Sequence, residues 1–125
     1  AAMRQHHRGG RIVLLTSVLG ERGLPNTSAY AAAHGGVHNL IRALSQEIAP
    51  LAITVNAIAL GWMEWMHDRL DPADPEAARA LRFPIIKRAG AAADIGALAV
   101  WLSGPGAGYV TGQIFPVDGG LLQHL

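Results

Sequence analysis

The segment GRIVLLTSVLG, at residues 10–20, and the stretch that begins at Ser28 decide the fold class of this chain of 125 residues. Residues 11–17 are apolar at nearly every position, and glycines stand on both sides, at Gly10 and Gly20. A run of this kind predicts a strand that is buried on both faces, as the strands of a parallel sheet are. A loop with glycine, proline and asparagine follows and leads into a helix.

This helix is predicted to run from Ser28, as its N-cap, to about Ala49, where Pro50 stops it. Its apolar side chains recur at helical spacing, and we expect them to form one stripe against the sheet: Ala33, Val37, Leu40, Ile41, Leu44 and Ile48. Gly35 and Gly36 cost about 1 kcal/mol each relative to alanine inside a helix. They therefore indicate a backbone that lies close to another helix or to a ligand.

The rest of the chain continues the alternation of strands and helices. Residues 53–60 predict a second buried strand, residues 94–103 a helix, and residues 113–117 a last strand. The helix is expected to turn four side chains inward: Ile95, Leu98, Ala99 and Leu102. The intervening residues are less regular and predict one short helix, from Asp74 to about Arg82.

This order of elements predicts an α/β fold, with a parallel sheet connected by right-handed crossovers. Three strands are few for such a sheet, and the first has no predicted neighbour on its outer side. An unpaired apolar edge invites association, so a homo-oligomer is expected.

Composition excludes several other classes of protein. Half of the residues are hydrophobic and 15% are charged, which is typical of a globular chain and not of a disordered one. The net charge is +1, and the basic cluster Arg4–Arg11 is better explained as a solvated connector than as an arm that binds nucleic acid. The sequence shows no cysteine, no signal peptide and no apolar run long enough to cross a membrane, so a cytoplasmic protein is expected.

Two hydroxyl side chains are predicted to lie where a ligand could bind. Ser17 ends the first predicted strand and Tyr30 lies in the first turn of the helix. In open α/β sheets, ligands bind outside the carboxyl ends of the strands. A phenol and a hydroxyl that face one carbonyl can polarise it and pass it a proton, which assists hydride transfer from a nicotinamide. From spacing alone, however, a turn serine and a packing tyrosine are the more ordinary interpretation.

Longer segments resemble one family of enzymes. The segments are residues 10–20, SAYAAA at 28–33, ITVNAIALG at 53–61 and YVTGQIFPVDGG at 109–120, with KRAG at 87–90 between them. In this order they resemble the short-chain dehydrogenase/reductase family, and enzymes such as the beta-ketoacyl-acyl-carrier-protein reductases in particular. The resemblance implies that residues 10–125 are the C-terminal half of a Rossmann-like, doubly wound parallel sheet, with residues 1–9 as a connector.

The resemblance also implies roles for single residues. Ser17 would hold the substrate's carbonyl or alcohol oxygen, and Tyr30 would be the acid in reduction and the base in oxidation. Gly61 and the backbone near Met63 would line the nicotinamide of NAD or NADP, with Tyr30 and His34 also at the cofactor. Three apolar side chains would line a small-molecule substrate: Trp62, Trp65 and Met66.

The sequence departs from the family pattern at several positions. His34 stands where the family has the lysine of Tyr-x-x-x-Lys, which is expected to hold the nicotinamide ribose and to lower the pKa of the tyrosine. Leu60 replaces the proline before Gly61, and Trp65 replaces a threonine. The 125 residues also hold no glycine-rich turn between a strand and a helix, no catalytic asparagine and no Asn-Ala-Gly segment. On its own, the chain is therefore expected to bind NAD(P) poorly.

Two alternatives stay open at this point. The chain is either part of an NAD(P)-dependent oxidoreductase for carbonyls and secondary alcohols, or a non-catalytic remnant that serves as an oligomer-forming partner of that fold. His34 and His38, four residues apart, also have a spacing that a zinc site can use. No third ligand is evident from the sequence, so no metal site is predicted.

Overall fold

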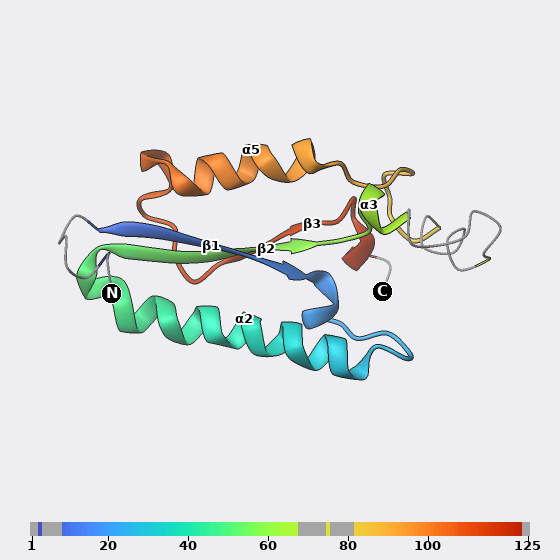
Figure 1. The fold of residues 1–125 in the computed structure, drawn as a ribbon, viewed down its shortest axis with the longest axis horizontal. Coiled ribbons are helices and arrows are strands. Elements are labelled where there is room, and N and C mark those ends of the chain that lie inside the picture. The colour runs from blue at the N-terminus through green and yellow to red at the C-terminus, as the bar shows by residue number, and fades with distance from the viewer. Residues whose placement is uncertain (1–2, 4–8, 68–74, 76–81, 124–125) are drawn as a thin grey trace.

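The computed structural model describes residues 3, 9–67, 75 and 82–123, and every structural statement below concerns these residues. Three parallel strands form one sheet in the order β1 (Gly10–Ser17), β2 (Ile53–Leu60), β3 (Ile114–Val117). In the register of the sheet, Ser17 lies opposite Leu60, and Leu60 lies opposite Val117. The three strands therefore end together, at one edge of the sheet (Figure 1).

Helices cover both faces of the sheet. Helix α2 (Ser28–Ile48) lies against one face and helix α5 (Ala92–Ser103) against the other (Figure 1). Successive residues of a strand point to opposite faces, so Ala57 packs in the core on the α2 side and Ile58 in the core on the α5 side. This arrangement confirms the predicted fold class, a doubly wound α/β sheet with crossover helices.

Shorter elements connect these. The 3-10 helix η1 (Val18–Gly20) follows β1, and η2 (Ala49–Leu51) carries Pro50 at the end of α2. Helix α3 (Glu64–His67) follows β2, and it was not predicted from the sequence. Two further 3-10 helices flank β3: η3 (Pro105–Ala107) and η4 (Leu121–Gln123). The short helix predicted from Asp74 to about Arg82 falls almost wholly outside the described residues.

Burial differs between the strands. β2 is buried along nearly its whole length, as predicted. The same prediction is wrong for β1, in which Gly10 to Leu14 are half-buried and the side chain of Leu15 is 59% exposed. The reason is topological, because β1 is an edge strand and β2 is its one strand partner among the described residues.

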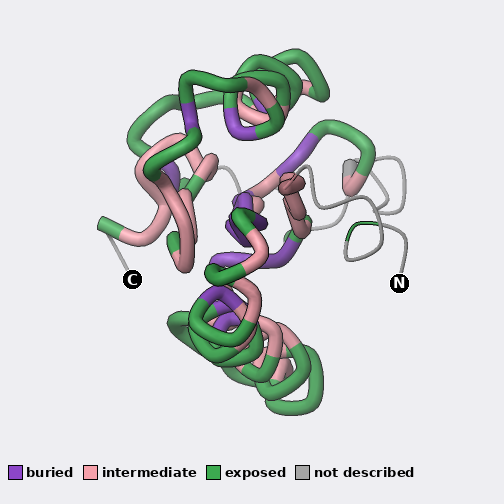
Figure 2. Tube along the Cα trace, turned by 90° about the vertical axis from the view of Figure 1, so that its left-hand side faces the viewer, coloured by how far each residue is buried: buried purple, intermediate pink, exposed green. Residues whose placement is uncertain are grey.

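Helix α2 carries two apolar stripes and not the single stripe predicted. Ile41 is fully buried, and Val37, Leu44 and Ile48 pack around it. Ala33 and Leu40 lie on the outer surface, where Leu40 is 52% exposed. Figure 2 shows this division, with the outer surface of α2 exposed and its buried residues toward the sheet.

The predicted N-termini of helices α2 and α5 differ from those in the structure by one or two residues. Ser28 is the first residue of α2, and the N-cap is Thr27, whose hydroxyl donates to the carbonyl oxygen of Leu24. Helix α5 begins at Ala92, and Asp94 lies in its first turn, where its carboxylate accepts a 2.7 Å hydrogen bond from the backbone N–H of Ala91. The four side chains expected to face inward from this helix do so: Ile95, Leu98, Ala99 and Leu102.

The close backbone approach expected at the helical glycines is present at Gly35. A Cβ atom at Gly35 would lie 3.1 Å from the carbonyl oxygen of Gly20, and one at Gly20 would lie 2.7 Å from the carbonyl carbon of His34. Helix α2 thus packs backbone to backbone against η1, whereas Gly36 has open space around it.

We expect Gly20→Ala to destabilise the chain by about 1–3 kcal/mol, because its Cβ has backbone atoms and no movable side chain in front of it. Gly96→Ala is the matched control, since Gly96 lies within α5 with open space around it and gains about 1 kcal/mol of helix propensity. Urea unfolding of both variants measures the difference. A Gly20→Ala variant as stable as Gly96→Ala would contradict the backbone contact.

Candidate active site

Ser17 lies at the carboxyl edge of the sheet, where β1 turns into η1. Its side chain is buried, and Oγ accepts a 3.2 Å hydrogen bond from the backbone N–H of Leu19. This bond fixes the side chain and uses a lone pair of the oxygen. The hydroxyl hydrogen is still available for a ligand oxygen.

Tyr30 presents its phenol from the first turn of α2. The side chain is 46% exposed, and its ring lies with its centroid 4.3 Å from that of His34, at an interplanar angle of 50°. The contact follows from helix geometry, because residues four apart lie one above the other on the same helix face. Tyr30 is therefore accessible and held by one neighbouring ring.

His34 joins this helix face to the sheet. Its Nδ1 lies 2.9 Å from the hydroxyl oxygen of Thr16, the residue before Ser17. Thr16 is on the α2 face of β1, together with Ile12 and Leu14. The fold thus brings the three predicted catalytic residues, Ser17, Tyr30 and His34, to one end of the molecule.

Sequence reasoning missed Thr16. The available signal was its position one residue before Ser17, at the carboxyl end of a strand that packs on α2. Strand periodicity alone places its hydroxyl on the helix side. The contact between this hydroxyl and His34 depends on the register of the helix against the strand, and the sequence pattern does not reveal that register.

His38, one turn beyond His34, is buried. Its side chain is 2% exposed, and Nε2 has no hydrogen-bond partner among the described residues. Burial lowers the pKa of His38, and the positive charge of Arg42 lowers it further, whereas Glu21 and a hydrogen bond with the Ser17 backbone act in the opposite direction. His38 is therefore a neutral core residue at neutral pH. The described residues contain no group of three His, Cys, Asp or Glu side chains that could hold a metal ion.

The residues after β2 divide between core and surface. Gly61 is buried, and a Cβ there would lie 2.5 Å from Cα of Asp118, so only glycine fits. Met63 is fully buried in the core on the α5 side, and its carbonyl oxygen accepts a hydrogen bond from the backbone N–H of Met66. Trp65 is exposed, and Met66 is half-buried against the same core.

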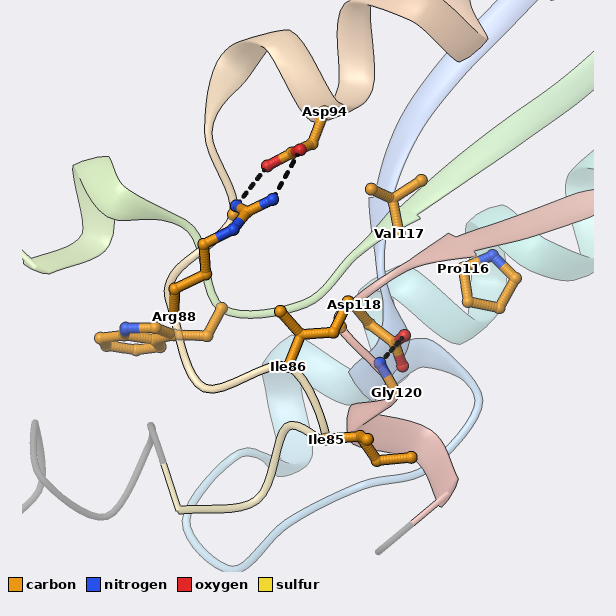
Figure 3. A pocket seen from close by; sticks show the side chains of 11 residues that line it. Ile85, Ile86, Arg88, Asp94, Pro116, Val117, Asp118 and Gly120 are labelled. Atoms are coloured by element: carbon orange, nitrogen blue, oxygen red, sulfur yellow. Dashed lines mark hydrogen bonds and ion pairs between the residues drawn. The ribbon is translucent and has the colours of Figure 1, made fainter.

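A cavity of about 530 Å³ lies at the carboxyl end of β3 and is called the β3-end cavity below (Figure 3). Trp62, Ile85 and Ile86 line it together with residues 116–120. Trp62 is the one predicted substrate-lining residue that borders it, and Ser17 and Tyr30 do not. The β3-end cavity is therefore separate from the site around Tyr30.

Polar groups of the β3-end cavity are bonded to one another (Figure 3). Arg88 forms a bidentate ion pair with Asp94, at 2.6 and 2.9 Å, and this pair lowers the pKa of Asp94 to about 2. Asp118 accepts hydrogen bonds from the backbone N–H groups of Gly120 and Leu122. These carboxylates hold the local structure and leave the cavity with mostly apolar contacts to offer.

Comparisons with known proteins match this fold. The family model described as enoyl-(acyl carrier protein) reductase matches residues 1–122. The 3-oxoacyl-[acyl-carrier-protein] reductase MabA of Mycobacterium avium is 36% identical over 122 residues, or 97% of this chain. The uncharacterized oxidoreductase YohF of Escherichia coli is 38% identical over 120 residues, or 96% of this chain. The chain belongs to the short-chain dehydrogenase/reductase family.

Solved structures of the family superpose well. A protein from Agrobacterium tumefaciens, named for 2-deoxy-D-gluconate 3-dehydrogenase and solved with bound NADP, has a TM-score of 0.88 and 36% identity, covering 97% of this chain and 50% of its own. An acetoin dehydrogenase from Enterobacter cloacae has a TM-score of 0.83 and 34% identity, covering 98% and 48%. The chain spans about half the length of the relatives it matches; MabA and YohF are covered to 47% each.

These relatives are oxidoreductases by name, and the fold and the ordered segments predicted from the sequence are confirmed by them. Among the described residues, no helix is both long and apolar enough to cross a lipid bilayer.

We expect the stability of the chain to fall as the pH drops through about 6.5, the ordinary pKa of a histidine. The folded state lowers the pKa of His38, so the unfolded chain binds a proton that the folded chain resists. His38→Leu removes this part of the pH dependence, whereas Asn39→Leu, on the exposed surface of α2, retains it. The free energy of unfolding in urea is measured between about pH 5 and pH 8. If it changes with pH equally in the parent and in His38→Leu, His38 is not the source of the pH dependence.

Proposed function

We propose that this chain is the catalytic half of an NAD(P)-dependent short-chain dehydrogenase/reductase that interconverts a carbonyl and a secondary alcohol on a small molecule. The observation that carries the proposal is the contact of His34 with both Tyr30 and Thr16 at the carboxyl end of the sheet, where Ser17 follows Thr16 in the chain. Membership of the family supports the reaction type.

In the proposed reduction, Ser17 donates its hydroxyl hydrogen to the substrate's carbonyl oxygen and holds it beside Tyr30. The hydride that reduces the carbonyl carbon would come from a bound nicotinamide. Tyr30 gives its phenolic proton to the oxygen as the alcohol forms, and in the reverse direction the phenolate takes that proton back. The exposed phenol and the fixed hydroxyl of Ser17 suit these roles.

We propose that these residues serve the nicotinamide end of NAD(P). We propose that His34 contacts the nicotinamide ribose, and that Gly61 and the backbone of Met63 line the nicotinamide amide. Gly104, Gly106 and Gly108 surround η3, but the chain then leads into β3 and offers no helix N-terminus for phosphate. Among the described residues, this glycine-rich segment therefore provides no turn for a pyrophosphate.

Trp62, Trp65 and Met66 are proposed to line the substrate side of this site, and Trp62 also borders the β3-end cavity. Trp65 is exposed at the start of α3 and so is available to a ligand or to another segment. We propose a cytoplasmic location for this enzyme.

A second candidate function is a non-catalytic, oligomer-forming partner of the same fold. The observation that favours it is the hydrogen bond between His34 Nδ1 and Thr16, which occupies one of the two ring nitrogens that would replace the lysine. Neutral imidazole supplies neither the charge nor the reach of an ammonium group.

The two functions are separated by His34→Lys, made in a chain completed by a nucleotide-binding half of the family. We expect the reductase rate to rise about tenfold, the effect of roughly 1.4 kcal/mol on the barrier, because lysine returns a positive charge beside Tyr30. Tyr30→Phe should lower the rate by about 10²–10⁴-fold. Steady-state kinetics with saturating NADPH measures both.

Cofactor binding by each variant is the control, measured by the fluorescence of NADPH. If His34→Lys binds NADPH and is no faster than the parent, His34 does not occupy the lysine's place. The non-catalytic function would then be the better description.

We also propose that α2 pairs with its copy in a second chain. Its outer surface carries small and apolar side chains at helical spacing, among them Ala33, Gly36, Leu40 and Ala43. Gly36 has open space around it, which would let two helices approach closely.

Leu40→Glu should therefore shift the chain from dimer to monomer, because a carboxylate buried at the helix contact would lose its hydration. Val100→Glu is the control, since Val100 is a similarly apolar and more exposed residue on α5. Sedimentation velocity at micromolar concentrations measures the state. A parent chain that is monomeric throughout would refute the pairing.

A further inference from the structure

Thr16 lies beside His34, and its hydroxyl contacts one of the two ring nitrogens of the histidine. Its side chain is 3% exposed, and its hydroxyl oxygen is 2.9 Å from Nδ1 of His34. Among the described residues this is the one hydrogen bond of the Thr16 side chain. The pair is therefore isolated from water on the threonine side.

The backbone around the pair holds both partners in place. Gly20 packs so closely on His34 that a Cβ atom would lie 2.7 Å from the carbonyl carbon of His34. Thr16 is two residues before η1, and its β-branched side chain has restricted χ1 freedom. The main chains that carry the two side chains are thus held close to each other by direct packing.

The hydrogen-bonding inventory of the two groups selects one tautomer. A threonine hydroxyl has one hydrogen to donate, and neutral histidine has one N–H and one bare nitrogen. If Nδ1 of His34 donated to Thr16, the buried hydroxyl hydrogen would lack an acceptor, which is costly. If Thr16 donates to Nδ1, both groups are satisfied and the ring hydrogen is on Nε2.

We propose that Thr16 is a positioning residue, which donates to Nδ1 of His34 and so holds the neutral ring with its hydrogen on Nε2, as a directed donor toward ligand oxygen. The class of ligand atom is a hydroxyl oxygen, such as that of a ribose; this part of the inference rests on the proposed function. The tautomer itself rests only on the buried pair. His34 then replaces a mobile ammonium group with a fixed N–H.

The test is nitrogen NMR of the imidazole rings in the 125-residue chain, uniformly labelled with ¹⁵N, at about two pH units above the ordinary histidine pKa of 6.5. We expect the signals of His34 to show a bare, hydrogen-bonded Nδ1 and a protonated Nε2. Thr16→Ser, which keeps the hydroxyl, should give the same pattern. Thr16→Val, which keeps the shape, should lose the hydrogen-bonded shift of Nδ1 and show exchange between both tautomers. His34→Gln assigns the signals.

A proton on Nδ1 in the parent chain would overturn the proposal, as would a Thr16→Val spectrum equal to that of the parent. A proton on Nδ1 in the parent chain overturns the proposal whether or not Thr16→Val folds, and Thr16→Ser against the parent keeps the role of the hydroxyl testable. Because the experiment needs neither cofactor nor substrate, failure of the proposed oxidoreductase function leaves its outcome unaffected.

Discussion

The contact between Gly20 and the backbone of α2 at His34 and Gly35 is the constraint on which the site depends. Because no side chain separates the two segments, the end of β1 and the first turns of α2 are fixed relative to each other by main-chain atoms. This brings Thr16 within hydrogen-bond distance of His34, and it places Tyr30 one helical turn further out. A side chain at Gly20 would push the helix away from the strand end and so disturb the site.

Much of the fold follows from local patterns in the sequence. The bounds of β2 agree with the apolar run at 53–60, and the inward face of α5 agrees with its spacing. Leu40 and Leu15 were predicted to be buried, and both are exposed for a common reason. An apolar residue is read as buried, but whether it is buried depends on which neighbours exist, and β1 has a neighbour on one side only among the described residues.

The site was predictable only in part. Ser17 and Tyr30 were found because the segments around them resemble a family, and their catalytic roles stay predictions. Thr16 and the burial of His38 were not found, since both depend on the register of α2 against β1. The β3-end cavity was missed for a similar reason, because residues 85–90 and 116–120 are brought together by the tertiary fold.

The crossover connections of the sheet have a consequence for how the chain folds. Gly10 pairs with Ile53, 43 residues further along, and Ala57 pairs with Ile114, 57 residues further along. Each pairing must therefore close a long loop before its contacts form, which costs chain entropy at the start of folding. During that time the apolar residues of β2 have no partner on either side. We expect a slow folder whose central strand is the segment most in need of protection from other chains as it emerges from the ribosome.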